Sequence, residues 1–252
     1  MPDFLASVRT YLFTDANIHH RTSEGRPGGH VPHPSLRENR FYYFDEDACQ
    51  AFFHAIEDLA MEEARGTLVA LVPSFKEFEA DRERYEQIGV TLDKVAVAAA
   101  GRIPRAIHRV HLTEAPQKIA ANYRMISFST GKLEVMFIAR AAGGGSQQFV
   151  GFFSFNPRLT QRMRTAMTAA LGGGVGELPE FERLLGLDQA AKQIEADLNR
   201  QREAMDRAMR ELREGGDPDR AGQLATELET GAMRMSEWKN RVSAMMAQLQ
   251  GR

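Results

Sequence analysis

The stretch LVALVPSF (Leu68–Phe75), which continues as KEFEADRERYEQI (Lys76–Ile88), indicates the fold most directly. Five apolar residues run without interruption between Gly66 and Pro73, as is typical of a strand buried on both faces of a parallel sheet. The next segment carries aromatic and aliphatic residues at helical spacing, so a strand is expected to lead through a short turn into an amphipathic helix over residues 75–88. In open α/β proteins, ligands bind at the carboxyl end of such a strand. The turn has no glycine, which excludes a phosphate-cradling nucleotide loop.

The segments on either side extend this pattern. An Asp-rich start at residues 45–47 predicts a helix that ends at Gly66. The remaining expected elements are strands at 94–100 and 105–112, a helical turn at 115–121, strands at 123–129, 132–141 and 147–155, and a helix that begins at Asn156-Pro157 and ends at 171. Helices that alternate with strands, followed by strands in succession, predict an α/β domain with a mixed sheet flanked by helices.

The last third of the chain has a different pattern, because apolar or small residues recur at alternating spacings of three and four on both sides of EGGDPD. This heptad seam predicts a C-terminal antiparallel helical hairpin that resembles a coiled coil. Two helices alone bury too little apolar surface, so we expect a protein partner, a homodimer or both through this hairpin. The expected interface residues are Leu187, Ile194, Leu198, Met205, Leu212, Leu224, Leu228, Met235, Trp238, Val242, Met245 and Leu249. Packing of the hairpin on its own domain is the alternative.

Three segments follow from these patterns. Residues 1–40 form an N-terminal segment with a flexible arm rich in His, Pro and Gly, residues 41–174 form the α/β domain, and residues 175–252 form the hairpin. The arm contains four histidines, but no cysteine or carboxylate pattern completes a metal site. We therefore expect no metal there, although the pattern alone leaves the question open. These histidines are His19, His20, His30 and His33.

Composition restricts the compartment and the class of protein. The 252 residues have a formal net charge of −2, and a single cysteine, Cys49, excludes an intrachain disulfide. The amino terminus lacks the basic leader and apolar run of a secretory signal, and no apolar run is long enough to span a membrane. A cytoplasmic protein without membrane contact is the expectation.

Charge is distributed unevenly along the chain. Residues 45–86 contain 12 acidic and 4 basic residues, a balance of −8, whereas residues 102–164 contain 10 basic and 2 acidic residues, a balance of +8. The two segments either neutralise each other or leave an electropositive face for an anionic ligand or partner. The alternative function that follows is a nucleic-acid-associated, DNA-binding protein that uses the basic segment 102–164, and steeply salt-dependent binding would identify it.

The sequence contains no recognisable catalytic set, so we expect no catalytic residue, no cofactor and no enzyme activity. Cys49 and His54 lie five residues apart on one helix, but this helix is rich in phenylalanine, which favours a buried structural thiol over a nucleophile. The carboxylate pair Glu57-Asp58 is expected on the solvated face of the same helix.

Several of these stretches together resemble the DICT sensory domain, which bacteria attach to diguanylate cyclases and two-component systems. The matching residues are Ala55-Ile56-Glu57-Asp58, Leu68 to Phe75, and Phe78 through Arg84-Tyr85. The resemblance continues through VAVAAAG, NYRMISFSTGKLEVMFIARA and QQFVGFFSFNPRLTQRM, and covers residues from about 41 to 171.

The resemblance implies a sensory or ligand-binding module rather than a catalyst. A helical hairpin follows the module in this chain, so its output is expected to be an interaction with another protein in bacterial signalling. A small anionic ligand would lie at the carboxyl ends of the strands, near Ser74, Phe75, Arg102 and Arg105. Arg158 and Arg162, at the start of the last helix of the domain, are further candidates, because a helix amino terminus favours anions.

Overall fold

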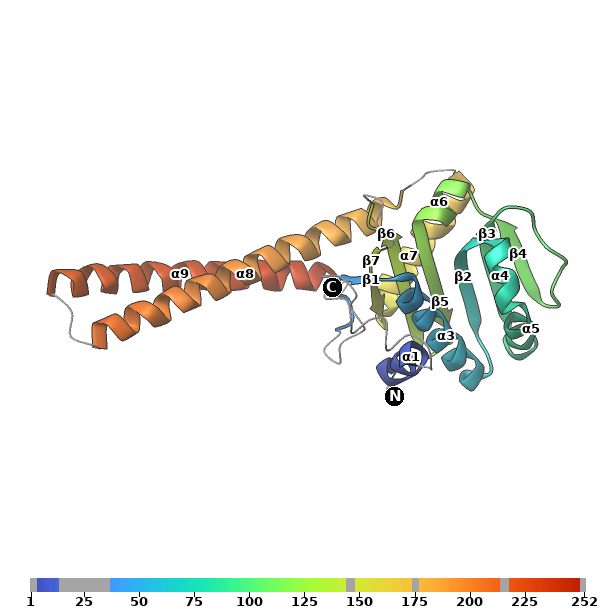
Figure 1. Cartoon of the computed structure of the whole chain (residues 1–252), viewed down its shortest axis with the longest axis horizontal. Helices are drawn as coiled ribbons and strands as arrows, with labels where there is room; N and C mark the ends of the chain where they lie inside the picture. Colours follow the sequence, from blue (N-terminus) through green and yellow to red (C-terminus); the bar gives the residue numbers. More distant parts are fainter. Residues whose placement is uncertain (1–3, 14–36, 144–147, 174–176, 214–217, 250–252) are drawn as a thin grey trace. The chain divides into compact units, whose positions relative to one another are not determined.

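A computed structural model describes residues 4–13, 37–143, 148–173, 177–213 and 218–249 (Figure 1). The chain divides into two compact units, Met1–Glu180 and Phe181–Arg252. The first unit is a mixed sheet flanked by helices and the second is a helical hairpin, so the predicted fold class is confirmed. The four histidines of the N-terminal arm lie outside the described residues.

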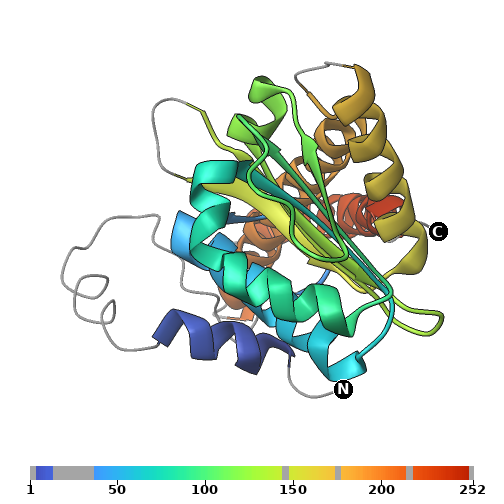
Figure 2. The same ribbon diagram turned by 90° about the vertical axis from the view of Figure 1, so that its right-hand side faces the viewer.

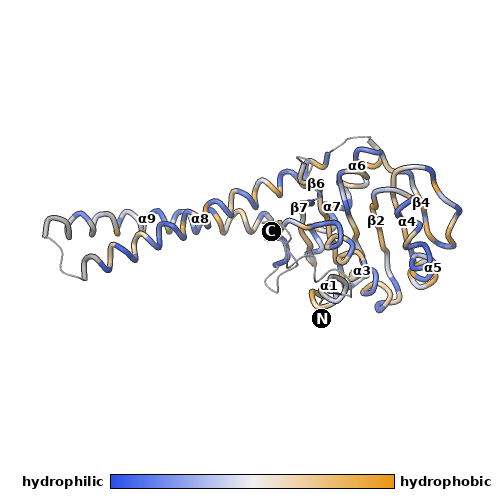
Figure 3. Tube along the Cα trace, in the orientation of Figure 1, coloured by the Kyte–Doolittle hydropathy of each residue, from blue (hydrophilic) through white to orange (hydrophobic). Residues whose placement is uncertain are grey.

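The sheet of the first unit has seven strands in the order β1-β7-β6-β5-β2-β3-β4. The strands are β1 (Tyr42–Phe44), β2 (Thr67–Ser74), β3 (Lys94–Ala100), β4 (Val110–Glu114), β5 (Tyr123–Ser129), β6 (Glu134–Ala141) and β7 (Phe149–Ser154). β2 pairs in parallel with β3, and β3 with β4. The four remaining pairings are antiparallel. Figure 3 shows hydrophobic colours along the strands, as expected of a sheet covered on both faces.

The helices form a layer on each side of this sheet (Figure 2). The helices of the first unit are α1 (Phe4–Phe13), α3 (Glu46–Glu63), α4 (Phe75–Phe78), α5 (Arg82–Thr91), α6 (Gln117–Asn122) and α7 (Pro157–Gly173). α1, α3 and α5 lie on one side of the sheet and α7 on the other. Arg164 of α7 donates hydrogen bonds to Ser129 and Glu134 at the end of β5 and the start of β6, which ties α7 to its face.

The main core lies between the sheet and α3 and is rich in aromatic rings. Phe52 of α3 stacks on Phe137 of β6 with a centroid distance of 4.4 Å and an interplanar angle of 6°. Phe44, Phe153 and Phe4 surround Phe52 at 5.4, 5.6 and 6.0 Å. β1 and α1, which the sequence patterns did not predict, therefore add to the core that α3 and β6 form.

The opening stretch folds largely as predicted, with two differences. β2 continues through Pro73 to Ser74, and its register with β3 shifts between Val72 and Ser74, because proline has no N–H to donate to the ladder. The single helix expected over residues 75–88 is instead α4, a 3₁₀ turn at Glu79–Asp81 and α5. The 3₁₀ turn reorients the chain and carries Asp81 to the side of α3.

The second unit consists of α8 (Pro179–Arg213), whose first residues belong to the first unit, and α9 (Pro218–Leu249). The two helices pack closely where Gly231 of α9 meets α8: a Cβ at this position would lie 2.6 Å from Gln201 Nε2 and 3.3 Å from Met205 Sδ. Ala191, Ala208 and Gly231 are buried. The larger predicted seam residues whose side chains are described are only half-buried, namely Leu187, Ile194, Leu198, Met205, Leu228, Met235, Trp238, Val242 and Met245. For Leu212, Leu224 and Leu249 the structure describes the backbone but not the side chain.

Candidate functional site

A pocket of about 220 Å³ opens at the carboxyl end of β2. Val72 and Pro73 form its floor, and the amino-terminal half of α3 forms one wall. The opposite wall comes from α4 and the 3₁₀ turn, and Arg124 closes it at the start of β5. β5 runs antiparallel to β2, so its first residues lie beside the last residues of β2. The helices on this face part at this position, because α3 packs on β5 and β6 whereas α4 packs on β2 and β3. Such a crevice is where open α/β sheets bind ligands.

Capping residues fix the start of both helices that line the pocket, α3 and α4. The side chain of Asp45 accepts a hydrogen bond from Ala48 N at 2.8 Å and begins α3. Ser74 Oγ accepts a hydrogen bond from Glu77 N at 3.2 Å and begins α4, and the same hydroxyl donates to Glu77 Oε1 at 3.2 Å. Ser74 therefore serves as a helix cap at the edge of the pocket.

Arg124 is the cation of the pocket, and its side chain is nine-tenths buried. Its Nε donates to Glu46 Oε1 at 2.9 Å and its Nη2 to Glu46 Oε2 at 3.3 Å. Nη1 donates to the carbonyl oxygens of Ala120 and Tyr123, each at 3.1 Å. The guanidinium also lies over the ring of Phe149, 4.8 Å from its centroid. These contacts fix Arg124 in one orientation and join the acidic segment of the chain to the basic one.

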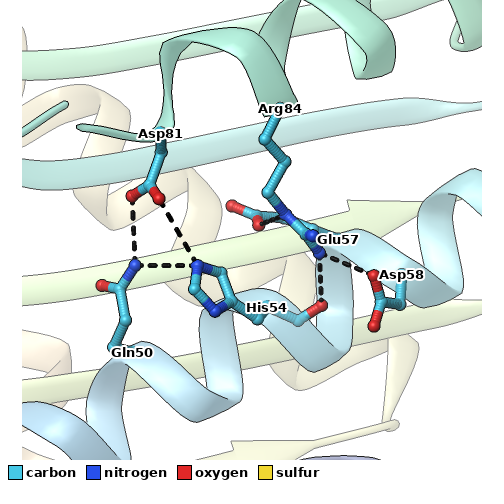
Figure 4. A network of polar contacts seen from close by, with 6 residues as sticks. All are labelled: Gln50, His54, Glu57, Asp58, Asp81 and Arg84. Carbon is cyan, nitrogen blue, oxygen red and sulfur yellow. Dashed lines mark hydrogen bonds and ion pairs between the residues drawn. The ribbon is translucent and has the colours of Figure 1, made fainter. Parts of the chain in front are cut away.

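Asp81 reaches the pocket from the 3₁₀ turn and is held by two residues of α3 (Figure 4). Gln50 Nε2 donates to Asp81 Oδ2 at 3.1 Å, and His54 Nε2 lies 3.5 Å from Asp81 Oδ1. The hydrogen bond with His54 lowers the pKa of Asp81 below its ordinary value, and Gln50 adds to this effect. Asp81 is therefore an ionised carboxylate at neutral pH.

A second group of charged side chains lies between α3 and α5 (Figure 4). Glu57 is only 2% exposed and accepts a short hydrogen bond from Arg84 Nε. Arg84 Nη2 also donates to Asp58 Oδ1 at 2.6 Å and to the carbonyl oxygen of His54 at 3.0 Å. Burial raises the pKa of Glu57, and the positive charge of Arg84 opposes that rise. Burial alone would lower the pKa of Arg84, but the carboxylates of Glu57 and Asp58 raise it above its ordinary value.

This group corrects one expectation from the sequence. Glu57 was expected with Asp58 on the solvated face of α3, and for Glu57 this was wrong. Adjacent helical residues diverge by about 100°, so Glu57 points toward α5 while Asp58 is partly exposed. The buried carboxylate is tolerated because Arg84 reaches it from the next helix.

The structure separates the six predicted ligand residues. Ser74 is the last residue of β2 and caps α4. Phe75 follows it and is buried, with its ring centroid 6.3 Å from that of Phe78. Arg102 is exposed just after β3, and Arg105 lines a different hollow of about 670 Å³ beside α5. Arg158 and Arg162 belong to α7 on the opposite side of the sheet, where Arg162 pairs with Glu180. The position at the end of β2 coincides with a pocket, and ligand binding by these six residues stays a prediction.

The sequence reasoning did not identify the polar residues that line this pocket, namely the charged Glu46, Glu77, Asp81 and Arg124 and the neutral Gln50. The available signal was the spacing of Glu46, Cys49, Gln50 and Phe53, which places these four residues on one face of a helix. Arg124, by contrast, is the one charged residue of a buried strand, and a charge at such a position is a signal of a paired or functional group.

Three arginines of the basic segment 102–164 form ion pairs: Arg124 with Glu46, Arg164 with Glu134, and Arg162 with Glu180. These pairs reduce the positive charge that a phosphate backbone could use. Association with nucleic acid stays an untested alternative.

Cys49 lines the pocket, but its side chain is only 1% exposed. Burial raises the pKa of the Cys49 thiol well above its ordinary value, and nearby Glu46 adds to this effect. Each unit by which a thiol pKa exceeds the pH lowers the thiolate fraction about tenfold. We therefore expect Ellman's reagent at pH 8 to modify the native protein at least about tenfold more slowly than the protein unfolded in guanidinium chloride. Equal rates would contradict a buried structural thiol.

Within the described ranges, no cluster of three or more His, Cys, Asp or Glu side chains could hold a metal ion. None of the helices that the structure describes combines the length and apolar character that crossing a membrane requires.

Comparison with known proteins bears on the family resemblance found in the sequence. No curated protein matches the chain. A solved structure of polyphosphate kinase from Porphyromonas gingivalis is similar at 15% identity, over 56% of this chain and 24% of that one, with a TM-score of 0.34. This chain thus spans about a quarter of the kinase, and so partial a likeness does not bear on function. Residues 33–141 match the family model of DICT, described as a sensory domain in diguanylate cyclases and two-component systems. The resemblance found in the sequence is confirmed, because residues 33–141 of this chain match the model of a sensory domain of signalling proteins.

Proposed function

We propose that this chain is a non-enzymatic sensory adaptor of bacterial signalling. Its DICT domain binds a small ligand in the pocket at the end of β2, and its helical hairpin transmits the signal by binding another protein chain. The observation that carries the proposal is the pocket itself, which lies at the crevice between α3 and α4 and within the residues that match the sensory family.

The chemistry of the pocket walls favours binding over catalysis. The thiol that lines the pocket, Cys49, is buried with a raised pKa, which disfavours the thiolate. Arg124 and Asp81 are held by neighbouring side chains in fixed positions, as in a preorganised binding site.

We propose the hairpin as the element that binds the partner, because its two helices cover their apolar seam only in part. Large apolar seam residues such as Trp238 and Val242 remain half-buried along α9. Apolar heptad positions gain most of their stabilisation when a further helix covers them. We favour a second copy of the same hairpin as the covering partner, which makes the protein a dimer.

Charge placed in this seam tests the dimer in the full chain. We expect sedimentation equilibrium to show a dimer for the wild type and a monomer for the double variant Leu228→Glu with Val242→Glu. Each buried glutamate should weaken association by about 2 kcal/mol or more, which is roughly thirtyfold.

The control is Met233→Glu, because Met233 is 72% exposed and a charge there should leave the mass of a dimer unchanged. Far-UV circular dichroism establishes that all variants keep their helices. A wild-type mass of one chain would exclude the homodimer, and a double variant that remains dimeric would exclude this seam as the dimer interface. Ligand binding is the other half of the proposal. Mass spectrometry of gently purified protein tests it, because a small molecule that co-purifies with the chain should be detected.

A further inference from the structure

We propose that the pocket at the end of β2 takes an organic cation: an ammonium, amidinium or guanidinium group on a short apolar body. This inference rests on the proposed function and gives the class of ligand. It departs from the anionic ligand that the basic segment 102–164 and the helix amino termini suggest.

The charge of the pocket favours a cation. Three carboxylates line it, from Glu46 of α3, Glu77 of α4 and Asp81 of the 3₁₀ turn, against the single cation of Arg124. They come from three separate elements that converge on one cavity, so they are not one solvated helix face. An ionised carboxylate accepts at about four lone-pair sites. Asp81 uses its sites toward Gln50 and His54, Glu77 toward Ser74, and Glu46 toward Arg124, which leaves acceptor capacity on each carboxylate among the contacts of the described residues.

Arg124 cannot readily serve an anion. A guanidinium has five N–H donors, and four of those of Arg124 are used by Glu46 and by the carbonyl oxygens of Ala120 and Tyr123. An anionic ligand would find one N–H of Arg124 left over by these contacts unless it displaced Glu46 from a bidentate pair, and it would meet the carboxylates of Asp81 and Glu77 as it entered. The pocket therefore offers acceptors to a ligand and few donors.

The remaining lining explains the apolar body. Phe53, Phe78, Val72, Pro73 and Ala80 form the apolar part of the wall. Aromatic rings beside carboxylates are a favourable environment for an organic cation, because the ring faces attract positive charge while the apolar part is removed from water. A cavity of about 220 Å³ restricts the ligand to a small molecule.

The test uses two probes of similar size and opposite charge, phenethylammonium and phenylacetate, with the full-length protein. Ligand-observed NMR titration should show that phenethylammonium binds at least about tenfold more tightly than phenylacetate. Asp81→Asn removes one charge from the wall with little change in shape, and we expect it to weaken phenethylammonium binding about five- to tenfold. The matched control is Glu83→Gln, because Glu83 is exposed on the adjacent α5 and lies outside the pocket lining, so its affinity should stay within about twofold.

Two results would overturn the inference. Preferential binding of phenylacetate that is lost in Arg124→Gln would show an anion site in the same pocket, and the proposed function would stand. Absence of binding by both probes up to about 10 mM would exclude the cation site. The proposed function would then still be tested by sedimentation equilibrium of the hairpin variants and by mass spectrometry of the purified protein. Thermal unfolding of each variant shows that a loss of binding is not a loss of folding.

Discussion

Replacing Arg84 with methionine is expected to lower the free energy of unfolding of the α/β unit by about 3 kcal/mol. Arg84 neutralises Glu57, whose carboxylate is 2% exposed between α3 and α5. Methionine keeps much of the side-chain volume but leaves this carboxylate buried without a counter-charge. The expected loss is at the lower end of the range for broken buried pairs, because Arg84 itself is partly exposed and Glu57 can take up a proton. Urea unfolding followed by circular dichroism measures the change.

The same variant should acquire a characteristic pH dependence. The pKa of Glu57 is already raised in the folded protein, and loss of Arg84 raises it further, since Arg84 lowers it in the wild type. The folded state then binds more protons than the unfolded state between the ordinary carboxyl pKa and the raised one. Stability therefore falls as the pH rises through this window, and the deficit of Arg84→Met is largest above it and smallest near pH 4.

A rescue experiment distinguishes the buried charge from a packing defect. Glu57→Met combined with Arg84→Met replaces the pair with apolar groups, and we expect it to restore most of the lost stability, because well-packed apolar replacements of buried pairs are often neutral or stabilising. Arg65→Met is the control, since Arg65 is exposed after α3 and its replacement should change stability by less than about 0.5 kcal/mol. A double variant that is as unstable as the sum of its single variants would exclude the buried charge as the cause.

The elements that sequence patterns predicted are those whose signal is local. β2, β3, β5, β6 and β7 are apolar runs bounded by breakers, and α7 starts at an Asn-Pro cap, so each could be recognised from its own residues. β1 is only three residues long and exists because β7 offers it an edge, which no local pattern reveals. α1, at residues 4–13, belongs to the segment before residue 41, whose Gly- and Pro-rich part predicts a loop and not a helix.

The sequence predicts the position of the candidate pocket but not the charged residues that line it. The carboxyl end of β2 followed from the order of strand and helix, which topology relates to ligand crevices. The charged lining depends on which residues of distant elements converge: Arg124 meets Glu46 across 78 positions of sequence, and Arg84 meets Glu57 across 27. The break between α4 and α5 had the same cause, because the 3₁₀ turn at Asp81 faces Gln50 and His54 of α3. Tertiary contacts of this kind override a helical periodicity that is continuous in sequence.

Phe52→Ala should have the largest effect on stability, a loss of about 4 kcal/mol in the free energy of unfolding. Phe52 is completely buried, and its ring contacts four other rings: Phe137 in a stacked pair and Phe44, Phe153 and Phe4 around it. Alanine removes the apolar area of a whole ring and leaves a cavity where α1, α3, β1, β6 and β7 meet. The three strands are held by backbone pairing in the sheet, so the cavity can collapse only in part, and the loss exceeds the transfer free energy of the ring.

A graded series separates this packing effect from general intolerance of α3 to substitution. Phe52→Leu should cost less than Phe52→Ala, because leucine refills part of the cavity. Tyr43→Ala on β1 is the control: Tyr43 is 47% exposed, and its loss should cost less than about 1 kcal/mol. The order Ala, Leu, wild type in rising stability follows from cavity size alone, whereas equal losses for both replacements of Phe52 would mean that the stacked pair with Phe137 has an all-or-none role in folding. The hairpin provides an internal reference, because dimerisation through α8 and α9 should respond to Leu228→Glu with Val242→Glu and not to Phe52→Leu.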